Sequence, residues 1–92
     1  MNIYLITFQM ADTGRSEAMV NCIKEYGLWA RITLNTWCIK ASNMTTAEIR
    51  SNLNSKLPLQ SNERLMVVNM TNAPWASYYL PKEVAEWLKD EK

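Results

Sequence analysis

The stretch LWARITLNTWCIKA at residues 28–41 decides the fold of this chain. Its two arms, residues 30–34 and 36–40, are rich in β-branched and aromatic side chains, and Asn35 between them favours a turn. Two strand-forming runs joined by so short a connection predict a β-hairpin. Because the hairpin lies near the middle of 92 residues, the segments on either side of it determine the topology.

Helical patterns flank the hairpin on both sides. Before it, apolar residues recur at helical spacing over residues 15–26, and Gly27 stands where a left-handed C-terminal cap is expected. After it, Thr45 and Glu48 have the spacing of a capping box, and Pro58 ends the helix that follows. The hairpin is therefore predicted to lie between two helices.

Two further strands complete the pattern. Residues 2–8 and 64–70 are apolar on both faces, which is typical of strands covered on both sides. The resulting order of strand, helix, strand, strand, helix, strand predicts an α+β, ferredoxin-like βαββαβ sandwich. In that fold an antiparallel sheet carries both helices on one face, and the last strand forms an edge beside the first.

Residues 72–92 extend this core of residues 1–71 within one domain. Residues 75–79 form a short aromatic segment that we interpret as extended, and Pro81 suits the first turn of a C-terminal helix.

Composition narrows the function classes. The chain is 48% apolar and 21% charged, which indicates a folded protein. Its net charge of +1 is lower than expected of a protein that contacts many phosphates. A local basic patch remains an alternative. The absence of His removes the usual general base. Cys22 and Cys38 are interpreted as free buried thiols, and without a leader or a bilayer-spanning run we expect a cytoplasmic protein that does not contact membranes.

The apolar character of the second sheet face predicts a partner. Two helices cover one face only, yet residues 2–8 and 64–70 are apolar on both, and an uncovered apolar face promotes aggregation. The C-terminal helix, the aromatic segment or a second copy must cover it, and we favour an isologous homodimer. The residues expected at a dimer or partner interface are Leu65, Val67, Trp75, Tyr78, Tyr79 and Trp87.

Four segments carry a family resemblance: the opening residues 1–8, the hairpin from Trp29 to Lys40, the helix start at residues 45–49 and the ending from Trp75 to Leu88. Together they resemble small bacterial proteins described as SinR-like, within the superfamily of CRISPR-associated protein 2 and VapD-type ferredoxin-like proteins. The resemblance covers nearly the whole chain. It implies a homodimer and a setting such as phage defence. In several relatives it implies nucleic-acid contact, either as metal-dependent ribonucleases or as scaffolds that hold DNA for a partner enzyme.

The same resemblance points to the end of the first strand. Nuclease relatives carry an aspartate there, and two copies meet around a divalent cation. This chain has Gln9 at that position, and a neutral amide does not replace a carboxylate as a strong Mg²⁺ ligand. The departure argues against nuclease activity.

Several residues remain candidates for a site. Asp12 is either a displaced Mg²⁺ ligand that pairs with its copy in a dimer or a helix N-cap, and we favour the cap. Gln9, Thr13, Arg15 and Ser16 surround a loop beside a helix N-terminus, where an anion such as phosphate would bind.

The hairpin and the aromatic residues offer a second kind of contact. Arg31 and Lys40, with Lys24, form either a basic patch for a nucleic-acid backbone or a solvated sheet edge. Trp29, like the aromatic residues of the C-terminal segment, either stacks on bases or belongs to a core or interface.

Three functions follow from these observations. We favour a non-catalytic homodimeric binding or scaffold protein that contacts nucleic acid or a protein. The alternatives are a metal-dependent endonuclease with a degenerate site, for which Mg²⁺ would be the only cofactor, and an inhibitor of another bacterial or phage protein.

Overall fold

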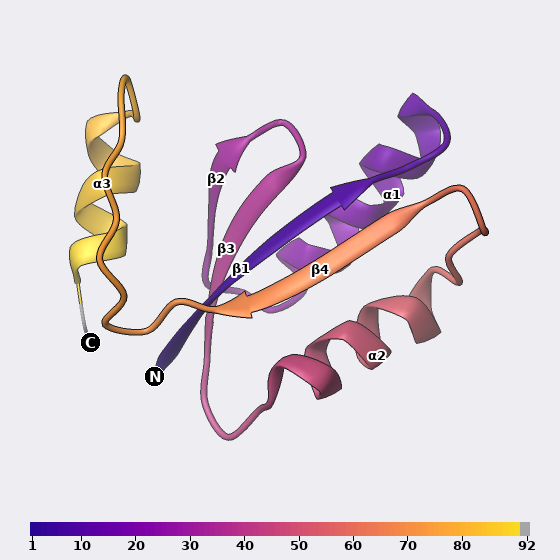
Figure 1. Cartoon of the computed structure of the whole chain (residues 1–92), viewed down its shortest axis with the longest axis horizontal. Helices are drawn as coiled ribbons and strands as arrows, with labels where there is room; N and C mark the ends of the chain where they lie inside the picture. The colour runs from indigo at the N-terminus through magenta and orange to yellow at the C-terminus, as the bar shows by residue number, and fades with distance from the viewer. Residues whose placement is uncertain (91–92) are drawn as a thin grey trace.

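Four strands form one antiparallel sheet in the computed structural model, which describes residues 1–90 (Figure 1). The strands stand in the order β2-β3-β1-β4, so that β4 is an edge strand beside β1. Together with the element order, this arrangement is the predicted ferredoxin-like fold with an added C-terminal helix. The elements are β1 (Asn2–Gln9), α1 (Thr13–Lys24), β2 (Trp29–Thr33), β3 (Thr36–Ala41), α2 (Thr46–Lys56), β4 (Arg64–Asn69) and α3 (Lys82–Lys89).

Local capping signals set where the helices begin. Asp12 is the N-cap of α1, which therefore starts two residues earlier than predicted and ends at Lys24. Thr45 and Glu48 form the predicted capping box of α2: the Thr45 hydroxyl accepts from the Glu48 N–H at 3.1 Å, and the Glu48 carboxylate accepts from the Thr45 N–H at 3.0 Å. Gly27 has a φ of 89°, which confirms its predicted left-handed conformation in the turn after α1.

The main core lies between the sheet and helices α1 and α2. Its sheet side comes from alternate residues of β1 and from β3, and each helix contributes two buried residues. Each large side chain buried there contributes about 1.5–3 kcal/mol relative to an exposed one. The core residues are Tyr4, Ile6, Phe8, Met19, Ile23, Trp37, Ile39, Ile49 and Leu53.

Helix α3 covers part of the opposite, outer face of the sheet. Leu88 is buried there in a second cluster with Ile3 and Cys38, and Val84 and Trp87 pack around them. The predicted C-terminal helix is thus one cover of the second face, and it packs on its own chain (Figure 1). Cys22 and Cys38 are free thiols, as predicted, but only Cys38 is fully buried, and Cys22 is half-buried.

The segment before α3 differs from the prediction. Residues 75–79 form no strand, and Tyr79 adopts a left-handed φ of 61°. Pro81 is the N-cap of α3 instead of its first residue. The aromatic segment is therefore an irregular loop, and it pairs with none of the strands in residues 1–90.

None of the helices in residues 1–90 combines the length and apolar character needed to cross a bilayer.

Candidate functional site

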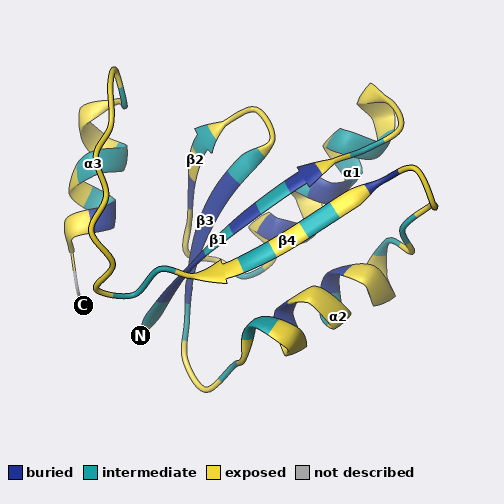
Figure 2. Ribbon diagram, viewed as in Figure 1, coloured by how far each residue is buried: buried dark blue, intermediate teal, exposed yellow. Residues whose placement is uncertain are grey.

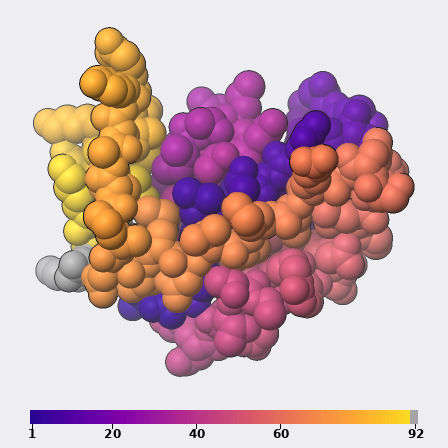
Figure 3. Space-filling view, in the orientation of Figure 1, coloured from indigo at the N-terminus to yellow at the C-terminus, as the bar shows by residue number. Residues whose placement is uncertain are grey.

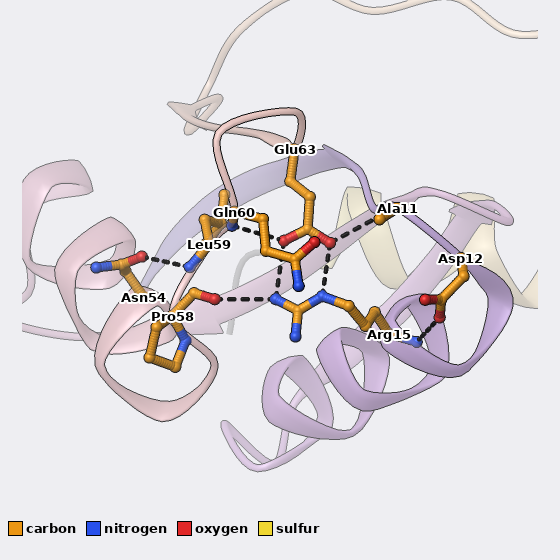
Figure 4. A network of polar contacts seen from close by, with 8 residues as sticks. All are labelled: Ala11, Asp12, Arg15, Asn54, Pro58, Leu59, Gln60 and Glu63. Carbon is orange, nitrogen blue, oxygen red and sulfur yellow. Dashed lines mark hydrogen bonds and ion pairs between the residues drawn. The ribbon is translucent and has the colours of Figure 1, made fainter.

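The loop after β1, predicted to contact anions, is held by an internal ion pair (Figure 4). Arg15 donates from Nε and Nη2 to the two carboxylate oxygens of Glu63 at 2.7 and 2.8 Å, and from Nη2 to the Pro58 carbonyl at 2.9 Å. The Glu63 carboxylate also accepts from the backbone N–H groups of Ala11 and Gln60, both at 2.9 Å. We refer to Arg15, Glu63 and these contacts as the Arg15–Glu63 clamp.

The electrostatics of the clamp agree with a structural role. The Glu63 side chain has no exposed surface, and the Arg15 guanidinium, helped by the two backbone donors, lowers the pKa of Glu63 to about 2. The same contact raises the pKa of Arg15. Because a bound carboxylate already occupies the guanidinium fork, Arg15 does not present that fork to an external phosphate.

The residues near the end of β1 do not fit a magnesium site. Gln9 is exposed and neutral, and Asp12 Oδ1 accepts the Arg15 N–H at 2.8 Å as a helix cap. Glu63 is already saturated by donors. Residues 1–90 contain no group of three or more His, Cys, Asp or Glu side chains placed to hold a metal ion. Mg²⁺ needs near-octahedral oxygen ligands that include one or two carboxylates, and the described residues at the end of β1 do not supply that set.

A groove of about 730 Å³ lies between α1 and the tip of the hairpin. Thr13 and Ser16 line one end of it beside Asp12, and Lys24 and Arg31 line the other. The structure therefore brings Thr13, Ser16 and Arg31 into one groove, while Arg15 is held in the clamp. Acidic and basic residues both border the groove, which gives it no single charge.

The basic residues predicted as a patch lie on opposite faces of the sheet. Arg31 is exposed opposite Trp37, on the helix side, whereas Lys40 is buried under α3 on the outer face. The Lys40 ammonium donates to the carbonyls of Trp87 at 2.7 Å and Asp90 at 2.8 Å, and lies 4.3 Å from the Trp87 ring centroid. Lys40 would reach a phosphate only if α3 moved away.

The outer face of β4 stays uncovered in residues 1–90. Leu5 pairs with Val68 and Thr7 with Met66, so these residues share the outer face with Ile3. Helix α3 packs near β2 and leaves the outer face of β4 uncovered, with 58% of Met66 and 40% of Val68 exposed (Figure 2). Leu5 is half-buried and packs against the cluster beneath α3. We call Met66 and Val68 the bare strip.

Two predicted interface residues of β4 face the other way. Leu65 and Val67 are half-buried and pack against the main core, because their β1 partners Phe8 and Ile6 point toward the helices. The exposed apolar residues are the alternate ones, Met66 and Val68. A run of four apolar residues has no alternation that would reveal this difference, so sequence reasoning missed them.

The edge of β4 is also open. The Met70 N–H donates to the Ile3 carbonyl at 2.9 Å. Because hydrogen-bonded pairs alternate along an antiparallel ladder, Val68 and Met66 also direct their backbone N–H and C=O groups to β1. The N–H and C=O groups of the alternate residues point away from the sheet. No strand lies beyond β4 in the part of the chain that the structure describes. The orange atoms of this strand lie on the surface in the space-filling view (Figure 3).

The remaining predicted interface residues lie in the loop before α3 and on α3 itself. Tyr78 is 91% and Tyr79 98% exposed, and their ring centroids are 6.1 Å apart. Trp75 is partly exposed with the Lys89 ammonium 6.0 Å from its ring, and Trp87 is half-buried against Lys40. We call Trp75, Tyr78 and Tyr79 the aromatic loop.

Comparison with models of known protein families gives no match, and comparison with curated proteins gives none either. The resemblance to the CRISPR-associated protein 2 superfamily therefore stays an expectation from the sequence.

Proposed function

We propose that this chain is a non-catalytic binding protein that acts as a homodimer. The observation that carries the proposal is the bare strip beside the open edge of β4. Exposed apolar side chains next to unpaired strand backbone favour association with another chain. An isologous contact between two copies would bring the apolar side chains of both strips together and supply hydrogen-bond partners to the unpaired backbone of both edges.

Support for a binding role also comes from the polar residues. Each group that would perform chemistry near β1 already holds the fold: Asp12 caps α1, and Arg15 and Glu63 bind each other. Burial raises the pKa of Cys38 to about 12 and also raises the pKa of Cys22, which keeps both thiols protonated and poorly nucleophilic.

We propose a protein as the partner of the dimer, bound through the aromatic loop. Exposed Tyr and Trp side chains offer large, rigid contact areas with one polar end, and such residues carry most of the binding energy in protein interfaces. A two-fold dimer presents the loop twice, which strengthens binding to a partner with two matching sites.

Nucleic-acid contact is a second candidate, carried by one cluster. The Lys24 ammonium lies 4.8 Å from the Trp29 ring centroid, and Arg31 borders the same groove. Such a cluster offers cations for phosphates and a ring for stacking. Binding of a single-stranded oligonucleotide that weakens steeply with salt, and weakens further in Arg31→Ala, would support this candidate over a protein partner.

Mass in solution tests the homodimer. Sedimentation across a wide concentration range should give twice the chain mass for the wild type. Met66→Asp should shift the mass toward the monomer, because a charged side chain would replace an apolar one in the contact between the two copies. Leu34→Asp is the matched control, since Leu34 is 76% exposed at the hairpin tip and its replacement should leave the mass unchanged. A wild-type chain that stays monomeric at every concentration contradicts the proposal.

A further inference from the structure

Alternate residues of β4 direct their backbone N–H and C=O groups away from β1. Because Met70 bonds to Ile3, and Val68 and Met66 follow it toward β1, the outward N–H and C=O groups belong to Leu65, Val67 and Asn69. These groups form a regular ladder with no strand opposite it in residues 1–90.

The edge of β4 has few of the features that keep edge strands apart, and its one charged residue, Arg64, stands at its first position. Its six residues contain neither Pro nor Lys, and its pairing with β1 runs without a register shift from Tyr4 to Gln9. The other edge strand, β2, has a register shift between Arg31 and Thr33 and lies beside α3. The β2 edge is therefore protected from pairing with another chain, whereas the β4 edge can accept a further strand.

Self-pairing of β4 is geometrically consistent. A two-fold axis perpendicular to the sheet keeps the outer face of one copy continuous with the outer face of the other. Opposed residues must then share a face, so antiparallel pairing joins odd positions to odd and even to even. If the axis passes through Val67, then Leu65 faces Asn69 of the other copy, and Met66 faces Val68.

We infer that two copies of this chain join edge to edge through β4, with Val67 on the two-fold axis, to form one continuous antiparallel sheet. This inference rests on the proposed homodimer and names its geometry.

With the two-fold axis at Val67, all outward-facing residues of β4 find a partner in the other copy. This register also sets the exposed Met66 of each copy against the exposed Val68 of the other, an apolar cross-strand pair on the outer face. An axis at Met66 would oppose Asn69 to Glu63, which lies outside the strand and is held in the clamp. In the favoured register the two Arg64 side chains lie at opposite ends of the interface, so they do not repel each other directly.

Cysteine cross-linking tests this geometry, with Cys22→Ser as the background. A hydrogen-bonded antiparallel pair separates its Cα atoms by about 5.5 Å, which suits a disulfide. Val67→Cys should therefore form a disulfide-linked dimer under mild oxidation on a non-reducing gel. Thr33→Cys, on the protected edge strand β2, is the matched control and should not form a cross-linked dimer.

A second test uses exposed positions, where substitution does not disturb the core. Met66→Cys and Val68→Cys, each oxidised alone, should remain single chains, and a mixture of the two should give the linked heterodimer. This pattern supports the register even if Val67→Cys folds poorly.

The outcomes separate this inference from the proposed homodimer. A dimeric mass in which neither Val67→Cys nor the mixture cross-links would overturn edge pairing and leave the homodimer standing. Self-linking of Met66→Cys alone would also overturn the register and indicate stacked outer faces. A monomeric wild type would overturn both.

Discussion

The outer face of the sheet has two halves that were built differently. The half near β2 carries Ile3 and Cys38 and lies beneath Leu88 of α3. The half near β4 carries the bare strip, of similar apolar character, and nothing in residues 1–90 covers it. The same chain thus supplies a helix for one half and leaves the other open beside an unpaired edge. The uncovered apolar surface therefore lies beside the one sheet edge where a second chain can add a strand.

Each half also depends on one ionic anchor. Lys40, from β3, acts as a C-terminal cap for α3 by donating to its last carbonyls and facing the Trp87 ring. Glu63, directly before β4, ties the start of that strand to α1 through Arg15. The anchors allow the two halves to be perturbed separately.

The largest effect is expected at Glu63, because four donors converge on its carboxylate. The folded state lowers the pKa of Glu63 from 4.5 to about 2, so the ionised group stabilises the fold fully above pH 4.5. That stabilisation is lost as the pH falls toward 2. Glu63→Gln should unfold more easily than the wild type in neutral urea titrations.

The difference in unfolding free energy between Glu63→Gln and the wild type should shrink steadily as the titrations are repeated at lower pH. Glu48→Gln is the control, since Glu48 belongs to an exposed cap. An equal loss of stability at pH 7 and at pH 2.5 would show that the charge of Glu63 is not the source.

The next effect compares truncations on the two halves. Leu88→Ala empties a buried position and should lower the free energy of unfolding by about 2–5 kcal/mol. Met66→Ala should change it by less than about 0.5 kcal/mol when measured at a concentration where the protein is monomeric. Equal costs at both positions would mean that the bare strip is covered within the single chain.

Much of the fold was predictable because its signals are local. The hairpin, the capping box at Thr45 and the turn at Gly27 each depend on residues a few positions apart, and all three appear in the structure. The strand order followed from the element order. Boundaries shifted by a few residues where a cap such as Asp12 took precedence over apolar spacing.

The candidate site was less predictable because its contacts are long-range. Arg15 was interpreted as an anion contact, and its partner Glu63 lies 48 positions away. Lys40 was interpreted as part of a basic patch, and the carbonyls that bind it belong to the end of α3. The facing of Leu65 and Val67 depends on which residues of β1 they pair with, and a continuously apolar strand does not encode that choice.

The smallest of the three effects is expected at Lys40, and it tests whether α3 is held in place by one residue. Lys40→Met keeps a long apolar stem but removes the donors to the carbonyls of Trp87 and Asp90. Hydrogen bonds from charged donors contribute about 1.5–3 kcal/mol, and relief from burying the charge offsets part of this. We expect a net loss of about 1–2 kcal/mol, confined to the attachment of α3.

Reaction of Cys38 with a thiol reagent reports that attachment, since Cys38 is fully buried in the cluster that contains Leu88. In a Cys22→Ser background, Lys40→Met should label faster than the parent, because α3 opens more often. Lys24→Met, which removes an exposed ammonium on α1, should label at the parental rate. Unchanged labelling in Lys40→Met would show that apolar packing alone holds α3 on the sheet. The contacts of Lys40 would then not explain why α3 covers the half of the outer face near β2.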